Sequence, residues 1–464
     1  MELTAVHWTG LLLTFGLILG SGLWSARTIH SHENYSLGGR SFGIPMIAGA
    51  IAGTIIGGGA TVGTAQMAWY SGLSAWWFTL GSGIGFIVMG LFYAGPLRRT
   101  GLETIPQYLS SHYGPSAEIA GSLISSFGSL FSAVSSTLPG IAVLSALFGL
   151  PPRISCLVLM LSVLAYICLG GMKGAGISGM IKLSILWSTL MFAGWNAGTA
   201  LSSDPLFALR FPADHWLNLF GTGIQSSMNQ LLSLIVGILC TQTYAQAIFS
   251  ASDQKAASAG CFAAAALVIP VGLPSIAIGL FMHAFHPDIT PIMSLPSYIL
   301  MYLPPWMGGI ALAGILLSLI SSIAGLTLGI STMLTRDIIF RLFPEKSGGF
   351  LLTANRTAAG AVLFLCSLLA LCYPESQVLF WNYLSMALRG GGIFIPFSMA
   401  LFIPGRISGF WASVSMLVST ASAVFWEITV PLPVQPLFVG LAVSLLINGL
   451  GMILKKKQTQ QLSL

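Results

Sequence analysis

Long apolar runs, separated by short connections rich in proline, glycine and charge, make up most of the chain. About 20 consecutive apolar residues cross the hydrocarbon core of a bilayer, so runs of this length predict membrane-spanning helices. The runs are continuous and do not alternate with polar residues, which argues against a membrane barrel. We therefore predict an all-α integral membrane protein with about 13 transmembrane helices, at approximately 5–25, 44–70, 73–95, 118–149, 154–171, 176–200, 221–247, 258–285, 307–334, 351–372, 378–402, 408–428 and 433–454.

The second predicted span contains a glycine-rich stretch at mid-depth, with Gly57, Gly58 and Gly59 in succession. A glycine costs roughly 1 kcal/mol relative to alanine in a helix interior, so three in a row favour a break. A broken backbone at membrane depth is tolerated where it is buried in protein or lines a cavity, and its carbonyls can then bind an ion or a solute. Close helix packing through small residues is the competing explanation, but it accounts for spaced glycines better than for a triplet. We predict a broken helix here.

Three serines of the ninth span, Ser318, Ser321 and Ser322, share one helical face at spacing i, i+3 and i+4. Hydroxyl and carbonyl oxygens are hard ligands that suit an alkali cation. Serines in membrane helices also commonly donate to their own helix, and spacing alone favours that role. The polar end of the seventh span, with Thr241 and Gln242, either lines a cavity or meets water at the helix end.

Two basic residues lie inside predicted spans, where charges are rare and often functional. We interpret Lys182, in the sixth span, as a lysine whose long side chain reaches the cytoplasm. The alternative is burial beside an ion site, where a lysine can replace the bound cation in a proton-linked manner. Arg389 directly precedes the triplet 390–392, which we predict to interrupt the eleventh span. Its guanidinium can attract a carboxylate, or it can bond to backbone carbonyls at the break.

Composition supports membrane insertion, because 55% of the 464 residues are hydrophobic, 6% are charged and the mean hydropathy is +0.87. Soluble domains contain about 25% charged residues. The net charge of +6 fits the enrichment of Lys and Arg in cytoplasmic loops better than binding to nucleic acid. The first apolar run, Val6 to Trp24, has no basic stretch before it, so we expect a retained span and not a cleaved signal.

The basic residues also predict the orientation. With the N-terminus outside and the C-terminus in the cytoplasm, only Arg153 and Arg210 fall in outer loops. We therefore expect an integral protein of the plasma (cytoplasmic) membrane. Its expected partners are the lipid bilayer, a solute and an ion, with no nucleic acid and no obligatory protein partner.

The chemistry-bearing residues argue against an enzyme. The six cysteines lack metal-ligand spacing, and the seven histidines lie in loops or near span ends. The sequence contains no His-Glu-x-x-His motif, nucleophile elbow or phosphate loop. We expect no catalytic residues and no organic cofactor.

Five short motifs occur in order between Asn34 and about Phe343: Tyr35-Ser36-Leu37-Gly38-Gly39-Arg40-Ser41, Thr104-Ile105-Pro106-Gln107-Tyr108-Leu109, Gly170-Gly171-Met172-Lys173, the loop 246–260, and Ser321-Ser322 with Thr335-Arg336-Asp337-Ile338. In this order and spacing the chain resembles the sodium:solute symporter family, which includes sodium-coupled sugar, proline, pantothenate, choline and sialic acid transporters. One departure is Ala247, where the family usually has arginine.

The resemblance implies a leucine-transporter type of fold with a 5+5 inverted repeat in a single transmembrane domain, 1–464. Its parts would be the first helix and inner loop 1–43, the first repeat 44–200, the second repeat 221–402, and the C-terminal helices and basic tail 403–464. The glycine-rich break and the polar end of the seventh span would then be equivalent positions in the two repeats.

The resemblance also implies a sodium site, with Na⁺ as the coupling ion. Carried over residue by residue, its ligands are the carbonyls of Gly53, Ile56 and Ser318 and the hydroxyls of Ser321 and Ser322. A second sodium site found in some members is not expected, because its aspartate and hydroxyl positions are Gly179, Ala324 and Gly325 here.

The solute is less constrained by the sequence. The sugar carriers' glutamine and glutamate correspond to Ala60 and Thr79, which argues against a sugar. The run 57–66 resembles the choline branch, but Arg389 would repel a quaternary ammonium. We predict sodium-coupled symport of a small organic acid or amino-acid-like solute by alternating access. The alternatives are a proton-coupled or sodium-independent carrier of the same fold and a choline-like cation carrier. The predicted solute-binding residues are Gly57, Gly58, Thr61, Thr79, Ser82, Thr241, Gln242 and Arg389.

Overall fold

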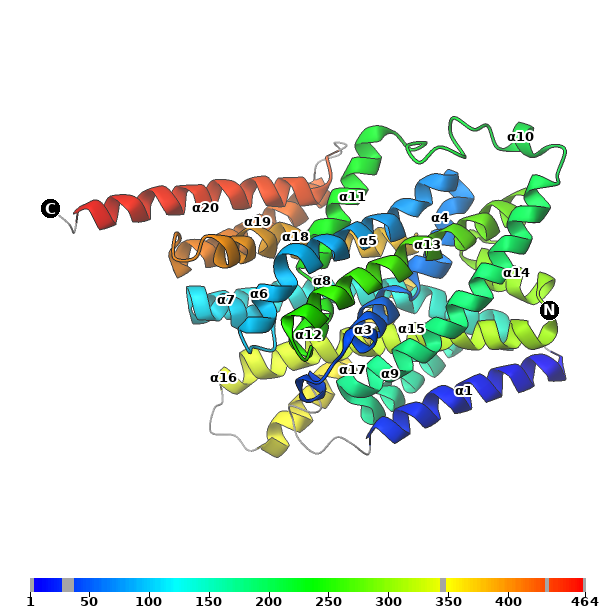
Figure 1. Ribbon diagram of the computed structural model, residues 1–464, viewed down its shortest axis with the longest axis horizontal. Coiled ribbons are helices and arrows are strands. Elements are labelled where there is room, and N and C mark those ends of the chain that lie inside the picture. Colours follow the sequence, from blue (N-terminus) through cyan, green and yellow to red (C-terminus); the bar gives the residue numbers. More distant parts are fainter. Residues whose placement is uncertain (1–3, 27–36, 343–347, 430–433, 462–464) are drawn as a thin grey trace.

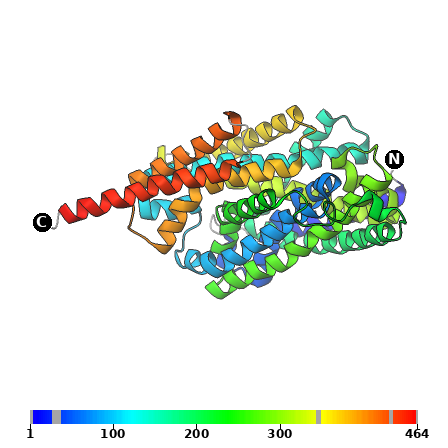
Figure 2. The ribbon, with the colours of Figure 1, turned by 90° about the horizontal axis from the view of Figure 1, so that it is seen from above.

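The computed structural model describes residues 4–26, 37–342, 348–429 and 434–461, and these residues form a helical bundle. Most helices run along the long axis of the molecule, with α10 and α14 at one end and α20 extending past the other end (Figures 1 and 2). The elements are α1 (Ala5–Ala26), η1 (Gly38–Arg40), α3 (Ile44–Ile55), η2 (Gly59–Gly63), α4 (Thr64–Ser71), η3 (Gly72–Trp76), α5 (Trp77–Val88), η4 (Met89–Tyr93), α6 (Ala94–Arg99), α7 (Ile105–Tyr113), α8 (Pro115–Phe148), α9 (Pro152–Ser202), α10 (Phe207–Arg210), α11 (Ile224–Leu239), α12 (Gln242–Phe249), α13 (Gln254–Phe285), η5 (Pro291–Met293), α14 (Ser294–Tyr302), α15 (Pro305–Met333), η6 (Leu334–Ile339), α16 (Phe340–Leu342), α17 (Gly348–Cys372), α18 (Val378–Phe402), α19 (Gly409–Thr429) and α20 (Pro436–Gln461).

The all-α prediction is confirmed, since the described residues contain helices and no strand beyond one isolated bridge between Phe42 and Ala251. Among these residues, eight helices are long and apolar enough to cross a membrane, and a bent pair can make a ninth. The count of 13 stays a prediction. The connection predicted around 170–173 is helical and lies within α9, and the side chains of 168–178 are outside the described part.

The predicted break in the second span is confirmed. Helix α3 ends at Ile55, Ile56 leaves the helical region with φ −77° and ψ 66°, and the chain resumes as the π-helix η2. The glycines permit close approach, because a Cβ on Gly57 would lie 2.5 Å from Ser322 Oγ. A Cβ on Gly59 would lie 2.7 Å from Asn382 Nδ2. Larger residues at these two positions would push the break away from its neighbours.

A second bend separates α11 from α12, whose axes differ by 46°. Cys240 and Thr241 form the joint, and the Thr241 hydroxyl donates to the carbonyl of Gly237 at 2.6 Å. The polar end of the predicted seventh span is therefore a bent helix pair inside the bundle, where Thr241 and Gln242 are both buried.

The predicted interruption of the eleventh span is wrong. Helix α18 continues through the triplet 390–392 without a break. These glycines serve close packing instead, since added Cβ atoms would lie 2.6 Å from Val236 Cγ1, 3.4 Å from Gly440 Cα and 2.3 Å from Thr420 Oγ1. Helices α11, α20 and α19 thus approach α18 on three sides, and small residues allow this proximity in membrane proteins.

Candidate functional site

Two serines of α15 bond directly to the broken end of α3. Ser318 Oγ donates to the carbonyl oxygen of Ile56 at 2.5 Å, and Ser322 Oγ donates to that of Thr54 at 3.1 Å. The last carbonyls of a helix have no partner within the helix, so they are available to such donors or to a cation. The predicted positions Ile56, Ser318 and Ser322 therefore meet, and the Thr54 carbonyl is an oxygen that the sequence analysis missed.

The third serine, Ser321, contacts Lys182 of α9. Lys182 Nζ donates a short hydrogen bond to Ser321 Oγ, which itself donates to the Ser318 carbonyl at 3.1 Å. Lys182 is 4% exposed, so the prediction that its side chain reaches the cytoplasm is wrong. Its ammonium turns inward because a hydroxyl partner is in reach at the α15 surface.

Gly53 lies beside the same lysine. A Cβ on Gly53 would be 3.3 Å from Lys182 Cε and 3.1 Å from Gly179 Cα. A Cβ on Gly179 would in turn be 2.7 Å from the Gly49 carbonyl oxygen. These glycines let α3 and α9 approach closely, which brings the Lys182 side chain past α3 to α15. All five predicted ion-site positions thus lie around the junction of α3, α9 and α15.

A small cavity of about 30 Å³, which has room for a water molecule, adjoins this junction. It is lined by Thr54, Ile55, Gly57, Gly58, Gly59, Phe78, Ser132, Ser135, Ser136, Thr241, Tyr244, Ser322, Leu326, Asn382, Met386 and Arg389. Four predicted solute-binding residues are therefore in the wall: Gly57, Gly58, Thr241 and Arg389. Thr54 and Ser322 belong to both the wall and the ion site, so the two regions are continuous.

Arg389 is the charged group of this wall and is 1% exposed. Its Nη2 donates to Ser385 Oγ at 2.8 Å and to Ser132 Oγ at 3.1 Å, and its Nε donates to the Ser385 carbonyl at 3.2 Å. Its Nη1 has no partner among the described residues. A Cβ on Gly128 would lie 2.4 Å from Arg389 Cγ, so that glycine makes room for the side chain against α8.

The other four predicted solute-binding residues do not line the cavity. Thr61 Oγ1 donates to the Gly57 carbonyl at 2.7 Å, and Ser82 Oγ donates to the Phe78 carbonyl at 2.5 Å. Both side chains are occupied within their own segment. Thr79 Oγ1 instead reaches the Ile269 carbonyl of α13 at 3.3 Å.

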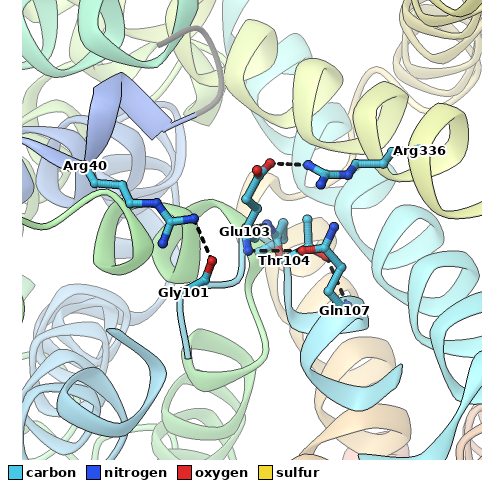
Figure 3. A network of polar contacts seen from close by, with 7 residues as sticks. Arg40, Gly101, Glu103, Thr104, Gln107 and Arg336 are labelled. Atoms are coloured by element: carbon cyan, nitrogen blue, oxygen red, sulfur yellow. Dashed lines mark hydrogen bonds and ion pairs between the residues drawn. The ribbon is translucent and has the colours of Figure 1, made fainter. Parts of the chain in front are cut away.

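The fourth of these residues, Gln242, connects α12 to the segment between α6 and α7. Its Oε1 accepts from the Ile105 backbone N–H at 2.9 Å, and its Nε2 donates to the Glu103 carbonyl at 3.1 Å. The Glu103 carboxylate also accepts a short bond from Arg336 of η6, while Arg40 donates to the Gly101 carbonyl at 2.6 Å (Figure 3). These bonds join η1, α12 and η6 to the segment between α6 and α7, at the end of the bundle opposite α10.

The sequence analysis missed the contribution of α8. Ser132, Ser135 and Ser136 face the cavity at spacing i, i+3 and i+4, the same pattern that singled out the serines of α15. Applying that pattern to the fourth predicted span would have found them. Asn382, Tyr244 and Phe78 carry no such local signal, because their positions in the wall depend on helix packing.

A family model described as "Sodium:solute symporter family" matches residues 35–409. This chain belongs to the sodium:solute symporter family. The high-affinity choline transporter 1 of Drosophila melanogaster is 25% identical over 393 residues, which cover 79% of this chain and 62% of that protein. The corresponding human transporter is 28% identical over 302 residues, covering 59% of this chain and 50% of that protein. The chain thus spans less than two thirds of the length of these relatives.

A further relative and a solved structure are also similar to this chain. The sodium/glucose cotransporter of Vibrio parahaemolyticus is 24% identical over 408 residues, covering 76% of this chain and 72% of that protein. The structure of a Na⁺-coupled sialic acid symporter in a substrate-bound outward-open state matches with a TM-score of 0.81 at 17% identity, covering 97% of both chains. The expected leucine-transporter type of fold is confirmed.

Proposed function

We propose that this member of the family couples the inward movement of sodium to the uptake of a small solute that carries an anionic group, such as a carboxylate. The observation that supports an anionic solute is the buried Arg389 in the cavity wall. No carboxylate of the described residues pairs with it, and its Nη1 has no partner there. A buried charge without a counter-charge is costly, so a carboxylate on the solute would complete the site.

Sodium is proposed to bind where the carbonyls of Gly53, Ile56 and Ser318 meet the hydroxyls of Ser321 and Ser322. Because Ser322 also lines the cavity, an ion here would order the broken end of α3 beside the solute. By reciprocity, the solute must then tighten sodium binding by the same factor that sodium tightens solute binding. Moving one charge across 100 mV contributes about 2.3 kcal/mol, before the concentration gradient is added.

A choline-like cation carrier is the second candidate, and the names of the choline transporter relatives favour it. The cavity wall has two aromatic rings, Phe78 and Tyr244, that can contact a quaternary ammonium. Arg389 in the same wall opposes it, because like charges repel strongly in a buried site. We therefore favour the anionic solute.

The test is a thermal-shift and uptake screen of purified, reconstituted protein against small organic acids, amino acids, sugars and choline. Each solute is measured in sodium chloride and in potassium chloride. We expect an anionic solute to bind more tightly with sodium, and Arg389→Gln to abolish that binding. Arg153→Gln, a change at an exposed arginine of α9, removes the same charge away from the cavity and serves as the control. Binding of choline alone, unaffected by Arg389→Gln, would overturn the anionic assignment.

The ion site has its own test in Ser321→Ala combined with Ser322→Ala. We expect this double variant to fold but to need a higher sodium concentration for half-maximal uptake. Unchanged sodium dependence would contradict the proposed ligands.

A further inference from the structure

The ammonium of Lys182 lies at the place where the proposed function requires an alkali cation. Its Nζ bonds to Ser321 Oγ, and its Cε passes the α3 backbone near Gly53. Both of these residues are proposed sodium ligands. The lysine is buried, and no carboxylate among the described residues forms an ion pair with it.

A sodium ion and this ammonium compete for the same oxygen. The Ser321 hydroxyl gives its hydrogen to the Ser318 carbonyl and accepts one N–H bond from Lys182. A hydroxyl has two lone pairs, so one remains, but sodium bound through it would sit directly beside the ammonium. Two like charges at that separation in a buried site repel each other strongly. Sodium can therefore occupy this corner only after the ammonium has left it.

We propose that the Lys182 ammonium is a tethered cation that occupies the Ser321 corner of the ion site when sodium is absent, so that sodium binds by displacing it. The inference rests on the proposed sodium site. A tether keeps the effective concentration of the ammonium high, which lowers the apparent affinity for sodium. Of the other proposed ligands, the Ile56 carbonyl accepts from Ser318 Oγ and the Ser322 hydroxyl donates to the Thr54 carbonyl in the same state.

The test compares the unmodified protein with Lys182→Met and Lys182→Gln, whose side chains are one atom shorter than lysine and carry no charge. Thermal unfolding is followed during a sodium chloride titration, with N-methylglucamine chloride keeping the ionic strength constant. If the ammonium holds the site nine-tenths of the time, its removal tightens apparent sodium affinity about tenfold. Lys255→Met, at an exposed lysine near the start of α13, removes an equal charge far from Ser321 and should leave the affinity unchanged.

The outcomes separate this inference from the proposed function. Tighter sodium binding in the Lys182 variants supports displacement, even if the unmodified protein shows no sodium response. Sodium binding that is equal in the unmodified protein and the variants overturns the tethered cation and leaves the sodium site intact. No sodium response in any of these proteins overturns both.

If the Lys182 variants fail to fold, the unmodified protein still decides the question. Structures determined by electron cryo-microscopy with and without sodium chloride should show Nζ at Ser321 only without sodium. An ammonium that stays at Ser321 in saturating sodium would refute the inference.

Discussion

Ser318 and Ile56 are 262 positions apart in the chain, and the serine hydroxyl donates a 2.5 Å hydrogen bond to the isoleucine carbonyl. The Ile56 carbonyl can accept this bond because α3 ends one residue earlier, at Ile55. The serine is available because it lies on the α15 face that meets this break. The bond therefore joins two segments, one from each proposed repeat, at the point where sodium is proposed to bind.

The first prediction concerns this bond. Ser318→Ala removes the donor and leaves the Ile56 carbonyl buried without it, which should cost about 1 to 3 kcal/mol of unfolding free energy. Loss of order at the break should also raise the sodium concentration for half-maximal uptake. Ser331→Ala is the control, because Ser331 is buried on the same helix and donates to its own helix at Leu328. Equal sodium dependence in the two variants would contradict the prediction.

The second prediction concerns the glycine triplet. In Gly57→Ala the new methyl would lie 2.5 Å from Ser322 Oγ, so either the serine or the break must shift. We expect uptake to fall severely and sodium-dependent stabilisation to weaken. The control is Gly325→Ala, one turn after Ser322 on α15, where no atom lies within 4 Å of the added Cβ. It should keep activity and stabilise the helix by up to about 1 kcal/mol. Full uptake by the Gly57 variant would show that the close approach is dispensable.

The third prediction concerns the ion pair of Glu103 and Arg336 at the end of the bundle opposite α10 (Figure 3). Both groups are partly exposed, so the pair should contribute at most about 1 kcal/mol. The pair also holds the segment between α6 and α7 in place beside α12, because the backbone carbonyl of Glu103 accepts a hydrogen bond from Gln242 Nε2. Glu103→Gln should therefore increase hydrogen exchange in residues 101–107 and 242–249.

The control for that experiment is the similarly exposed pair of Glu118 and Arg341, at 2.7 Å. Glu118→Gln should leave exchange in residues 101–107 and 242–249 unchanged, because Glu118 lies on α8 and has no bond to Gln242. Exchange that rises equally in both variants would mean that general charge loss, not this connection, is responsible.

The fourth prediction concerns Asp253, which begins α13. Its Oδ1 accepts from the Ala256 backbone N–H at 2.9 Å, and this bond lowers the pKa of the carboxyl below its ordinary value of 3.8. A lowered folded-state pKa gives stability that is complete above the unfolded-state pKa and is lost as pH falls through the folded-state pKa. The carboxylate's advantage over Asp253→Asn should thus be complete well above pH 3.8 and be lost progressively as the pH falls below that value. Melting curves across this pH range test it, and a difference that persists in strong acid would disprove it.

Much of the ion site followed from local patterns. Three successive glycines at 57–59 predicted a break because the helix penalty of each adds up in one place. Three serines at i, i+3 and i+4 must share a face, so they were certain to present hydroxyls together. The family resemblance then paired these two features, and the structure brings Ile56 and Ser318 into contact.

Neighbouring helices decided the rest. Glycines at 390–392 had the same local pattern as those at 57–59, yet α18 continues because α11, α19 and α20 pack closely against it. Lys182 has a side chain long enough to reach the cytoplasm or to turn inward. It turns inward because its ammonium donates to the Ser321 hydroxyl. Thr79 and Gln242 are polar residues in expected places, but their partners on other segments turn them away from the cavity.

The sequence alone determined that the chain is an all-helical member of this family, that its second span breaks, and which serines share a face. These properties depend on residues close together in the chain. Only the tertiary structure decided that a lysine ammonium sits among the proposed ion ligands and that an arginine borders the cavity with no carboxylate partner in the described part of the chain. A buried charge takes its role from the groups around it, and those groups come from helices distant in sequence.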